Sequence, residues 1–247
     1  MVAVPARPAM TGAELQMSGP SSAHEPIVYA VDDDPQISHA AAELVRSFGC
    51  QAKTFDSPKA FVDHLDQIPP DQVGCVVVDL RMPGMDGLEV HQQIVDRELP
   101  LPTILVTGYA DTALTVRALR SGVLAVLDKP CRDNELWSFV QEGLARSEET
   151  LRCRRHLRML EDRFRRLQPQ DRHVLQLILQ GCKNRTMAKR LEVSLRTVEN
   201  RRRRVFEVMQ ADSVAELTRM VMEYEHQLGP SPGRSEAWMS LPYEKAV

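Results

Sequence analysis

Five polar residues in the first half of the chain follow short apolar runs and have the side chains that phosphoryl chemistry needs. Asp32 and Asp33 follow IVYAV, Asp79 follows CVVV, Thr107 follows TILV, and Lys129 follows AVLD. Each run has the composition of a buried parallel strand, and stretches with helical periodicity separate the runs. Because ligands of open parallel sheets bind at the carboxyl ends of the strands, we expect these five groups to meet in one pocket.

Three carboxylates, a hydroxyl and an ammonium group can hold a divalent cation and a phosphoryl group together. Mg²⁺ prefers a few carboxylates together with water and phosphate oxygens. Asp79 is the predicted nucleophile, and it must be ionised to attack phosphorus. Lys129 and the cation would keep it ionised, while Thr107 can donate a hydrogen bond to a phosphoryl oxygen. Taken singly, each aspartate reads more readily as a turn or cap residue and Lys129 as a surface charge. Their shared placement favours the pocket.

This half of the chain resembles the receiver domains of two-component response regulators, over roughly residues 27–145. The matching motifs are VDDDP, VDLRMPGMDG, TGYAD and DKP. The resemblance implies an α/β doubly wound, five-stranded parallel sheet with the flavodoxin-like order 2-1-3-4-5. It also implies that Asp79 accepts phosphate from a sensor histidine kinase.

The same resemblance implies a magnesium site and a cis peptide bond. The cation would bind Asp32, Asp33, Asp79 and the main-chain carbonyl of Arg81. The cis bond would join Lys129 to Pro130, since an X–Pro bond adopts the cis form at little cost.

Two positions depart from the receiver pattern. Val126 stands where these domains usually carry an aromatic switch residue, so a rotating ring cannot be the switch here. Cys131 replaces the Phe often found after the Lys-Pro pair.

The net charge of −3 conceals two halves of opposite sign. Residues 27–150 hold 10 Lys and Arg against 20 Asp and Glu, whereas residues 151–229 hold 18 against 10. A basic second half indicates a polyanionic partner. The five cysteines form no CxxC pair, which argues against zinc sites and disulfides and favours a cytoplasmic protein. No apolar run approaches the ~20 residues of a membrane span.

The basic half has the pattern of a four-helix domain with a helix-turn-helix. One helix begins at Pro169 and ends near Gly181, and a short one covers 184–191. The next is capped by Ser194 and extends to about Met209, and a capping box opens the last at Ser213. The core stripe of the third helix is predicted to consist of Leu195, Val198, Val205, Phe206 and Met209. The run Arg201–Arg204 would be a solvated face in isolation, but its place on a predicted recognition helix favours DNA.

Residues 160–226 resemble the LuxR-type DNA-binding domain, so the whole chain resembles a FixJ-type response regulator. Gln168 and Gln170 replace the usual Thr and Arg, and Arg201 stands where His is common. By the family's docking mode, base edges would be read by Glu199, Asn200 and Arg203. Other DNA contacts would come from Lys183, Arg185, Arg196, Thr197 and Arg204.

The expected organisation has five parts: a disordered leader (1–26), a receiver domain (27–149), a helical linker (150–166), the DNA-binding domain (167–228) and a disordered tail (229–247). In the linker, Cys153, Leu157, Leu160, Phe164 and Leu167 form an apolar seam with 4-3-4-3 spacing. This seam could pair with a second subunit or pack on its own domain, and the sequence favours neither.

We therefore expect a cytoplasmic, phosphorylation-controlled transcription regulator with no membrane association, which dimerises and binds double-stranded DNA. RNA polymerase is a further candidate partner. One alternative is a receiver that acts through protein contacts or as a phosphate sink, beside a DNA-binding domain that no longer binds. The other is a phosphohydrolase enzyme, which would need a general acid at the position of Arg81. We do not expect the chain to be an enzyme.

Overall fold

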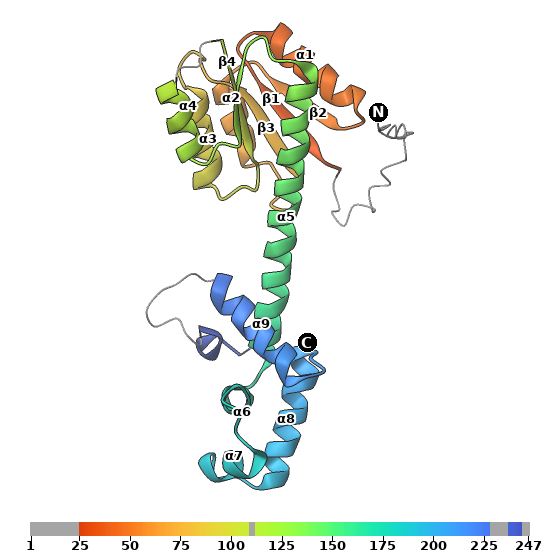
Figure 1. Ribbon diagram of the computed structural model, residues 1–247, viewed down its shortest axis with the longest axis vertical. Coiled ribbons are helices and arrows are strands. Elements are labelled where there is room, and N and C mark those ends of the chain that lie inside the picture. The colour runs from red at the N-terminus through yellow and green to blue at the C-terminus, as the bar shows by residue number, and fades with distance from the viewer. Residues whose placement is uncertain (1–24, 109–111, 228–236, 244–247) are drawn as a thin grey trace, which may run out of the picture. The chain divides into compact units, whose positions relative to one another are not determined.

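The computed structural model describes residues 25–108, 112–227 and 237–243. The chain divides into two compact units, Met1–Leu151 and Arg152–Val247. The first is an α/β unit and the second is helical (Figure 1). Within the described ranges, no helix is long and apolar enough to cross a membrane. Most of the expected leader lies outside the described residues.

A parallel sheet of five strands forms the centre of the first unit. Its order, β2-β1-β3-β4-β5, confirms the predicted topology. The strands are β1 (Ile27–Val31), β2 (Gln51–Phe55), β3 (Gly74–Asp79), β4 (Thr103–Thr107) and β5 (Ala125–Asp128). All six residues of β3 and all five of β4 are buried, because these strands lie inside the sheet with helices on both faces.

Helices cover both faces of this sheet and enclose two apolar cores (Figure 1). One core receives side chains of α2, α3 and α4, and the other receives those of α1 and α5. The helices are α1 (Pro35–Ser47), α2 (Pro58–Leu65), α3 (Gly87–Asp96), α4 (Thr112–Arg120) and α5 (Asp133–Arg166). Asp34 and Ser57 cap α1 and α2 through their side chains, each with Pro at the first helical position.

Four further helices build the second unit, and their bounds agree with the sequence prediction. They are α6 (Pro169–Leu179), α7 (Asn184–Arg190), α8 (Leu195–Met209) and α9 (Val214–Gln227). Gly181 follows α6 with φ +72°, a backbone conformation that a side chain would disfavour, so glycine suits this C-terminal position. Ser194 caps α8 by accepting a hydrogen bond from the Thr197 main chain at 3.1 Å.

The expected linker, residues 150–166, is the C-terminal part of α5. Leu160, Phe164 and Leu167 of its apolar seam are buried in the core of the second unit, and Leu157 packs against that core. Of the two alternatives for the seam, the structure therefore favours packing on its own unit.

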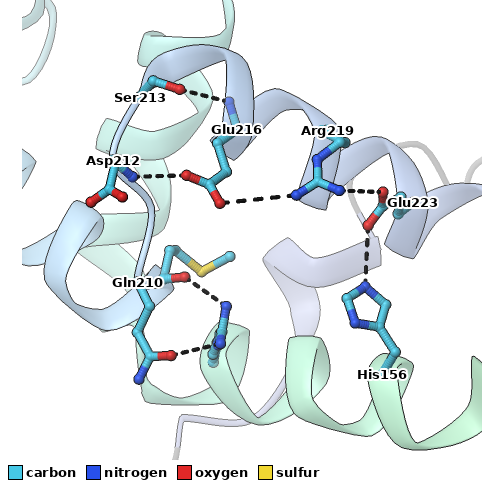
Figure 2. A network of polar contacts seen from close by, with 9 residues as sticks. His156, Gln210, Asp212, Ser213, Glu216, Arg219 and Glu223 are labelled. Atoms are coloured by element: carbon cyan, nitrogen blue, oxygen red, sulfur yellow. Dashed lines mark hydrogen bonds and ion pairs between the residues drawn. The ribbon is translucent and has the colours of Figure 1, made fainter. Parts of the chain in front are cut away.

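Polar contacts also hold this part of α5 to α9 and to the turn before it (Figure 2). His156 Nε2 lies 3.2 Å from Glu223 Oε2, and Glu223 pairs with Arg219 at 3.4 Å. Ser213 accepts from the Glu216 main chain at 3.2 Å, while the Glu216 carboxylate accepts from the main chain of residue 212 at 2.9 Å. Ser213 therefore caps α9 as predicted, while the Glu216 side chain contacts the main chain one residue before Ser213 instead of closing the predicted capping box.

Part of the expected disordered tail is ordered, which corrects that prediction. Residues 237–240 form a short 3₁₀ helix, η1 (Ala237–Ser240), and residues 237–241 are called the C-terminal strap below. Trp238 is fully buried, and its ring stacks on Phe164 with centroids 5.7 Å apart. The buried guanidinium of Arg172 donates to the carbonyls of Phe164 (3.0 Å), Met239 (3.2 Å) and Leu241. The strap therefore belongs to the core of the second unit.

Candidate functional site

The carboxyl ends of four strands bring Asp32, Asp79, Thr107 and Lys129 to one edge of the sheet. Asp32 follows β1, Asp79 ends β3, Thr107 ends β4 and Lys129 follows β5. The first three are buried, with exposed fractions of 5%, 7% and 1%. Asp33, the fifth predicted member, is exposed at the same edge. The sequence therefore placed the strand ends correctly.

Lys129 lies between the two buried carboxylates. Its ammonium group donates to Asp32 Oδ2 at 2.7 Å and lies 2.6 Å from Asp79 Oδ1. Burial alone would lower the pKa of Lys129, but its hydrogen bonds and charge interactions with Asp32 and Asp79 outweigh burial, so this pKa is raised. Lys129 therefore stays charged between the two carboxylates.

The loop after β3 approaches Asp79 closely. The other oxygen, Oδ2, accepts a hydrogen bond from the main-chain N–H of Arg81 at 2.7 Å. A Cβ atom at Gly87 would lie 2.6 Å from the main-chain oxygen of Asp79, so only glycine fits at the start of α3. Each carboxylate oxygen of Asp79 therefore has a partner, Lys129 on Oδ1 and the Arg81 main chain on Oδ2.

The donor types at this edge suit Mg²⁺, although the three aspartates do not converge on one point. Within the described residues, no three His, Cys, Asp or Glu side chains could hold a metal ion as they stand. Mg²⁺ commonly takes only one or two carboxylates and completes its shell with carbonyls, water and phosphate oxygens. Asp32 and Asp79 are two buried carboxylates of that kind, and Lys129 and main-chain N–H groups contact them. The residues present thus fit the cation by chemistry.

Thr107 and Lys129 link the ends of β4 and β5. The main-chain N–H of Lys129 donates to the Thr107 carbonyl at 2.7 Å, so the two ends are joined directly. Residues 109–111 of the loop after Thr107 lie outside the described residues. Val126 is half-buried and packs against the core on the α4 side. The Lys129–Pro130 bond is cis, as expected.

Cys131 lines a cavity that sequence analysis did not foresee. The cavity, about 40 Å³, lies beneath the pocket and is bordered by Asp32 and Asp79. Burial raises the pKa of the Cys131 thiol, so it is a neutral group there.

The second unit presents the predicted DNA contacts on α8 and around α7. Seven of them have exposed side chains and Thr197 is half-buried; the seven are Lys183, Arg185, Arg196, Glu199, Asn200, Arg203 and Arg204. Arg203 Nη2 lies 3.4 Å from Asn200 Oδ1, so these two predicted base-reading side chains are neighbours.

The core stripe of α8 is partly different from the prediction. Val198, Val205 and Met209 are fully buried, as predicted. Leu195, however, is 41% exposed, and Phe206 is half-buried beneath the guanidinium of Arg202. Leu195 is the first residue of α8, so it lies at the end of the predicted stripe.

The four consecutive arginines at 201–204 do not share one environment. Arg201 donates to Gln170 Oε1 at 2.6 Å, and Arg204 Nε lies 3.1 Å from Asp171 Oδ2. Gln170 and Asp171 were not among the predicted functional residues. The sequence signal that could have marked this contact is the pair of departures at Gln170 and Arg201.

Comparison with known families matches both units. Residues 28–141 match the response regulator receiver domain, and residues 165–221 match the bacterial regulatory proteins of the luxR family.

Several known proteins are similar along most of the chain. The transcriptional regulatory protein FixJ of Bradyrhizobium diazoefficiens is 32% identical over 195 residues, which cover 79% of this chain and 94% of that protein. The tetrathionate response regulatory protein TtrR of Salmonella typhimurium is 32% identical over 192 residues, 78% of this chain and 90% of its own length. A solved structure of the response regulator StyR covers 81% of this chain and all of its own, with 32% identity and a TM-score of 0.75. The chain therefore belongs to the FixJ-type response regulators, transcription regulators that join a receiver domain to a DNA-binding domain of the luxR family.

Proposed function

We propose that Asp79 is the residue through which phosphorylation controls DNA binding by this regulator. A carboxylate oxygen of Asp79 forms a bond to phosphorus, while the bond between phosphorus and the histidine nitrogen of a sensor kinase breaks. The observation that carries this assignment is the contact of Lys129 with Asp79 Oδ1 at 2.6 Å. It supplies a cation where the transferring group needs neutralisation, on the only carboxylate that ends a buried central strand in the described chain.

Mg²⁺ would be held by Asp32, Asp33, Asp79 and the main-chain carbonyl of Arg81. When bound, it supplies positive charge to the phosphoryl oxygens and to the attacking carboxylate. Asp32 is buried and Asp33 is exposed, so Asp32 would fix the position of the cation and Asp33 would complete its shell from the solvent side. The main-chain N–H of Arg81 donates a hydrogen bond to Asp79, so the backbone of the loop after β3 lies beside this carboxylate.

Thr107 and Lys129 would respond to a phosphoryl group on Asp79 with a conformational change. A phosphoryl group adds about −1.5 to −2 charges. Both residues would be drawn toward it, and the main-chain bond between them would carry the shift into the loops after β4 and β5. Val126 has no ring to rotate, so this route is the main one. The altered surface would favour a homodimer, whose DNA-bound form could contact RNA polymerase.

The exposed polar face of α8 would enter the major groove. Asn200 and Arg203 have the donor and acceptor geometry for adenine and guanine, and Glu199 can accept from cytosine. Lys183, Arg185, Arg196 and Thr197 would contact phosphates, which position the domain without reading sequence. Arg204 was predicted as a further contact, and its ion pair with Asp171 competes with that role.

The decisive experiment compares Asp79→Asn with Asp96→Asn, a matched change at the end of α3. Full-length protein is incubated with Mg²⁺ and a small phosphodonor such as acetyl phosphate, and the attached phosphate is measured by intact mass. We expect labelling of the wild type and of Asp96→Asn, and none of Asp79→Asn. Labelling that survives in Asp79→Asn would refute the assignment. A wild type that is labelled but binds no DNA at any salt concentration would favour the phosphate-sink alternative.

A further inference from the structure

Two polar pairs join the first turn of α6 to the recognition helix α8. Gln170 Oε1 accepts from Arg201 Nη2 at 2.6 Å, and Asp171 Oδ2 lies 3.1 Å from Arg204 Nε. Gln170 and Asp171 are adjacent on α6, and their partners are three residues apart on α8, about one helical turn. We call these two pairs the α6–α8 clamp.

Asp171 is an unusual residue for such a contact because its side chain is only 2% exposed. Burial raises the pKa of Asp171, and the charges of Arg204 and Arg201 oppose that effect. Its Oδ2 atom accepts no well-directed hydrogen bond, so the contact with Arg204 is mainly ionic. Removing the ionic partner of a buried carboxylate is costly. Asp171 therefore holds Arg204 in place more firmly than a surface pair would.

The clamp lies beside the residues that would read bases. Arg201 directly follows Asn200 in the sequence, and Arg204 directly follows Arg203. Because a helix has 3.6 residues per turn, each clamp arginine is the angular neighbour of a base-reading residue. Any rotation of α8 about its axis that moved Asn200 and Arg203 would therefore also pull both arginines from their α6 partners. The clamp thus has the geometry to fix the rotation of the recognition helix.

The chemistry of the Gln170 side chain suits this contact. Its amide oxygen is an acceptor, and the guanidinium of Arg201 has only donors to offer.

We propose that Gln170 and Asp171 are positioning residues for DNA recognition, and that Arg204 acts on sequence reading through Asp171 instead of binding a phosphate. This inference rests on the proposed DNA-binding function and assigns part of its specificity to α6.

The test uses full-length protein and a DNA duplex selected by the wild type from a random library. Dissociation constants are measured on the selected duplex and on a scrambled one at several salt concentrations. The variants are Asp171→Asn, Arg204→Gln, the double variant, and Gln170→Ala. Arg219→Gln, which removes an equal charge from an ion pair on α9, is the matched control.

Loss of the clamp should lower the ratio of the affinity for the selected duplex to that for the scrambled duplex. In Asp171→Asn and in Arg204→Gln we expect a decrease of roughly tenfold, which is comparable to the effect of one wrong base pair in the site. The double variant should be no worse than either single one, because both remove the same contact. The salt slope of Arg204→Gln on scrambled DNA should equal that of the wild type and of Arg219→Gln. Gln170 is uncharged and exposed, so Gln170→Ala should keep the fold and still lower the ratio a few-fold.

Two results would overturn the clamp alone. The first is that Arg204→Gln lowers the salt slope by about one unit while Asp171→Asn leaves both the slope and the affinity ratio unchanged. Arg204 would then be a phosphate contact. The other is an unchanged ratio in Asp171→Asn, Arg204→Gln and Gln170→Ala. Thermal unfolding of each variant, followed by circular dichroism, fixes an assay temperature at which all are folded. A wild type that selects no DNA would overturn both this inference and the proposed function.

Discussion

The ammonium group of Lys129 lies 2.6 Å from Oδ1 of Asp79, so the predicted nucleophile is already paired with a cation before any phosphoryl group arrives. The same ammonium contacts Asp32, which makes Lys129 the centre of a buried group of charges. Such a group is sensitive to the loss of its one cation, because two carboxylates then remain close together in a water-poor site.

Replacing Lys129 by Met should therefore reduce the stability of the first unit. Without added divalent cation at neutral pH, we expect Lys129→Met to lose about 1–3 kcal/mol of unfolding free energy. Lys53→Met, at an exposed position of the edge strand β2, should change this free energy by less than about 0.5 kcal/mol. Urea denaturation followed by circular dichroism measures both. Equal losses in the two variants would show that the contact in the pocket contributes nothing to stability.

Thr107→Ala should separate phosphate acceptance from its consequence. Asp79 and Lys129 are intact in this variant, so it should be labelled by acetyl phosphate as the wild type is. It should dimerise poorly, because the hydroxyl that would be drawn to the phosphoryl group is missing. Sedimentation of both phosphorylated proteins checks this expectation. Equal dimerisation would mean that the signal leaves the pocket by another route, and a wild type that stays monomeric would contradict the dimer model.

Arg203→Ala and Lys183→Ala should weaken DNA binding in different ways. Arg203→Ala should cost about 1–3 kcal/mol on a selected site and relax preference at one base pair. Lys183→Ala should weaken selected and scrambled DNA alike and lower the salt slope by about one unit. Titrations at several salt concentrations distinguish the two patterns. If Arg203→Ala weakened both DNAs equally, Arg203 would be a phosphate contact.

Tyr29 should make the first unit sensitive to alkali. Burial raises the pKa of Tyr29 from 10.0 to about 12, so the folded protein holds this proton more tightly than the unfolded chain. The stability contributed by the protonated group is complete below pH 10 and is lost as the pH rises toward 12. We expect the wild type to lose about 1–2 kcal/mol more than Tyr29→Phe between roughly pH 9.5 and 11.5. Denaturation curves of both proteins across this range measure the difference, and parallel pH profiles would contradict it.

Trp238→Ala should destabilise the second unit. It removes a fully buried indole that stacks on Phe164, so we expect a loss of about 3–5 kcal/mol in unfolding free energy. Trp238→Phe keeps most of the apolar volume and should cost clearly less. Denaturation of the second unit, followed by helical circular dichroism, compares the two. A negligible loss in Trp238→Ala would mean that the strap contributes little to the core.

The elements and the pocket could be predicted because their signals are local. A buried parallel strand requires a continuous apolar run, and its last residue marks the edge where ligands bind, so Asp79 and Thr107 could be placed from their neighbours alone. Helix caps such as Ser57 and Ser194 are likewise set within four residues.

The remaining features depend on contacts between distant segments. The partner of Arg204 is 33 positions away in Asp171, and Trp238 meets Phe164 across a larger separation. Periodicity assigned Leu195 to the apolar side of α8, but it could not show that this side chain stays exposed in the folded unit. The linker seam had the spacing of a dimer interface and of a core stripe equally, and the burial of Leu160, Phe164 and Leu167 in the core of the second unit favours the core stripe.

The C-terminal strap has a practical consequence for anyone who wishes to study DNA binding with an isolated fragment. A fragment cut at the limits of the luxR family match, residues 165–221, would lack Leu160, Phe164, Tyr224 and Trp238, four residues of one apolar core. Such a fragment would expose the side chains that these four cover, and self-association would follow from that surface. A fragment of residues 152–243 retains all four core residues together with the carbonyls that Arg172 binds.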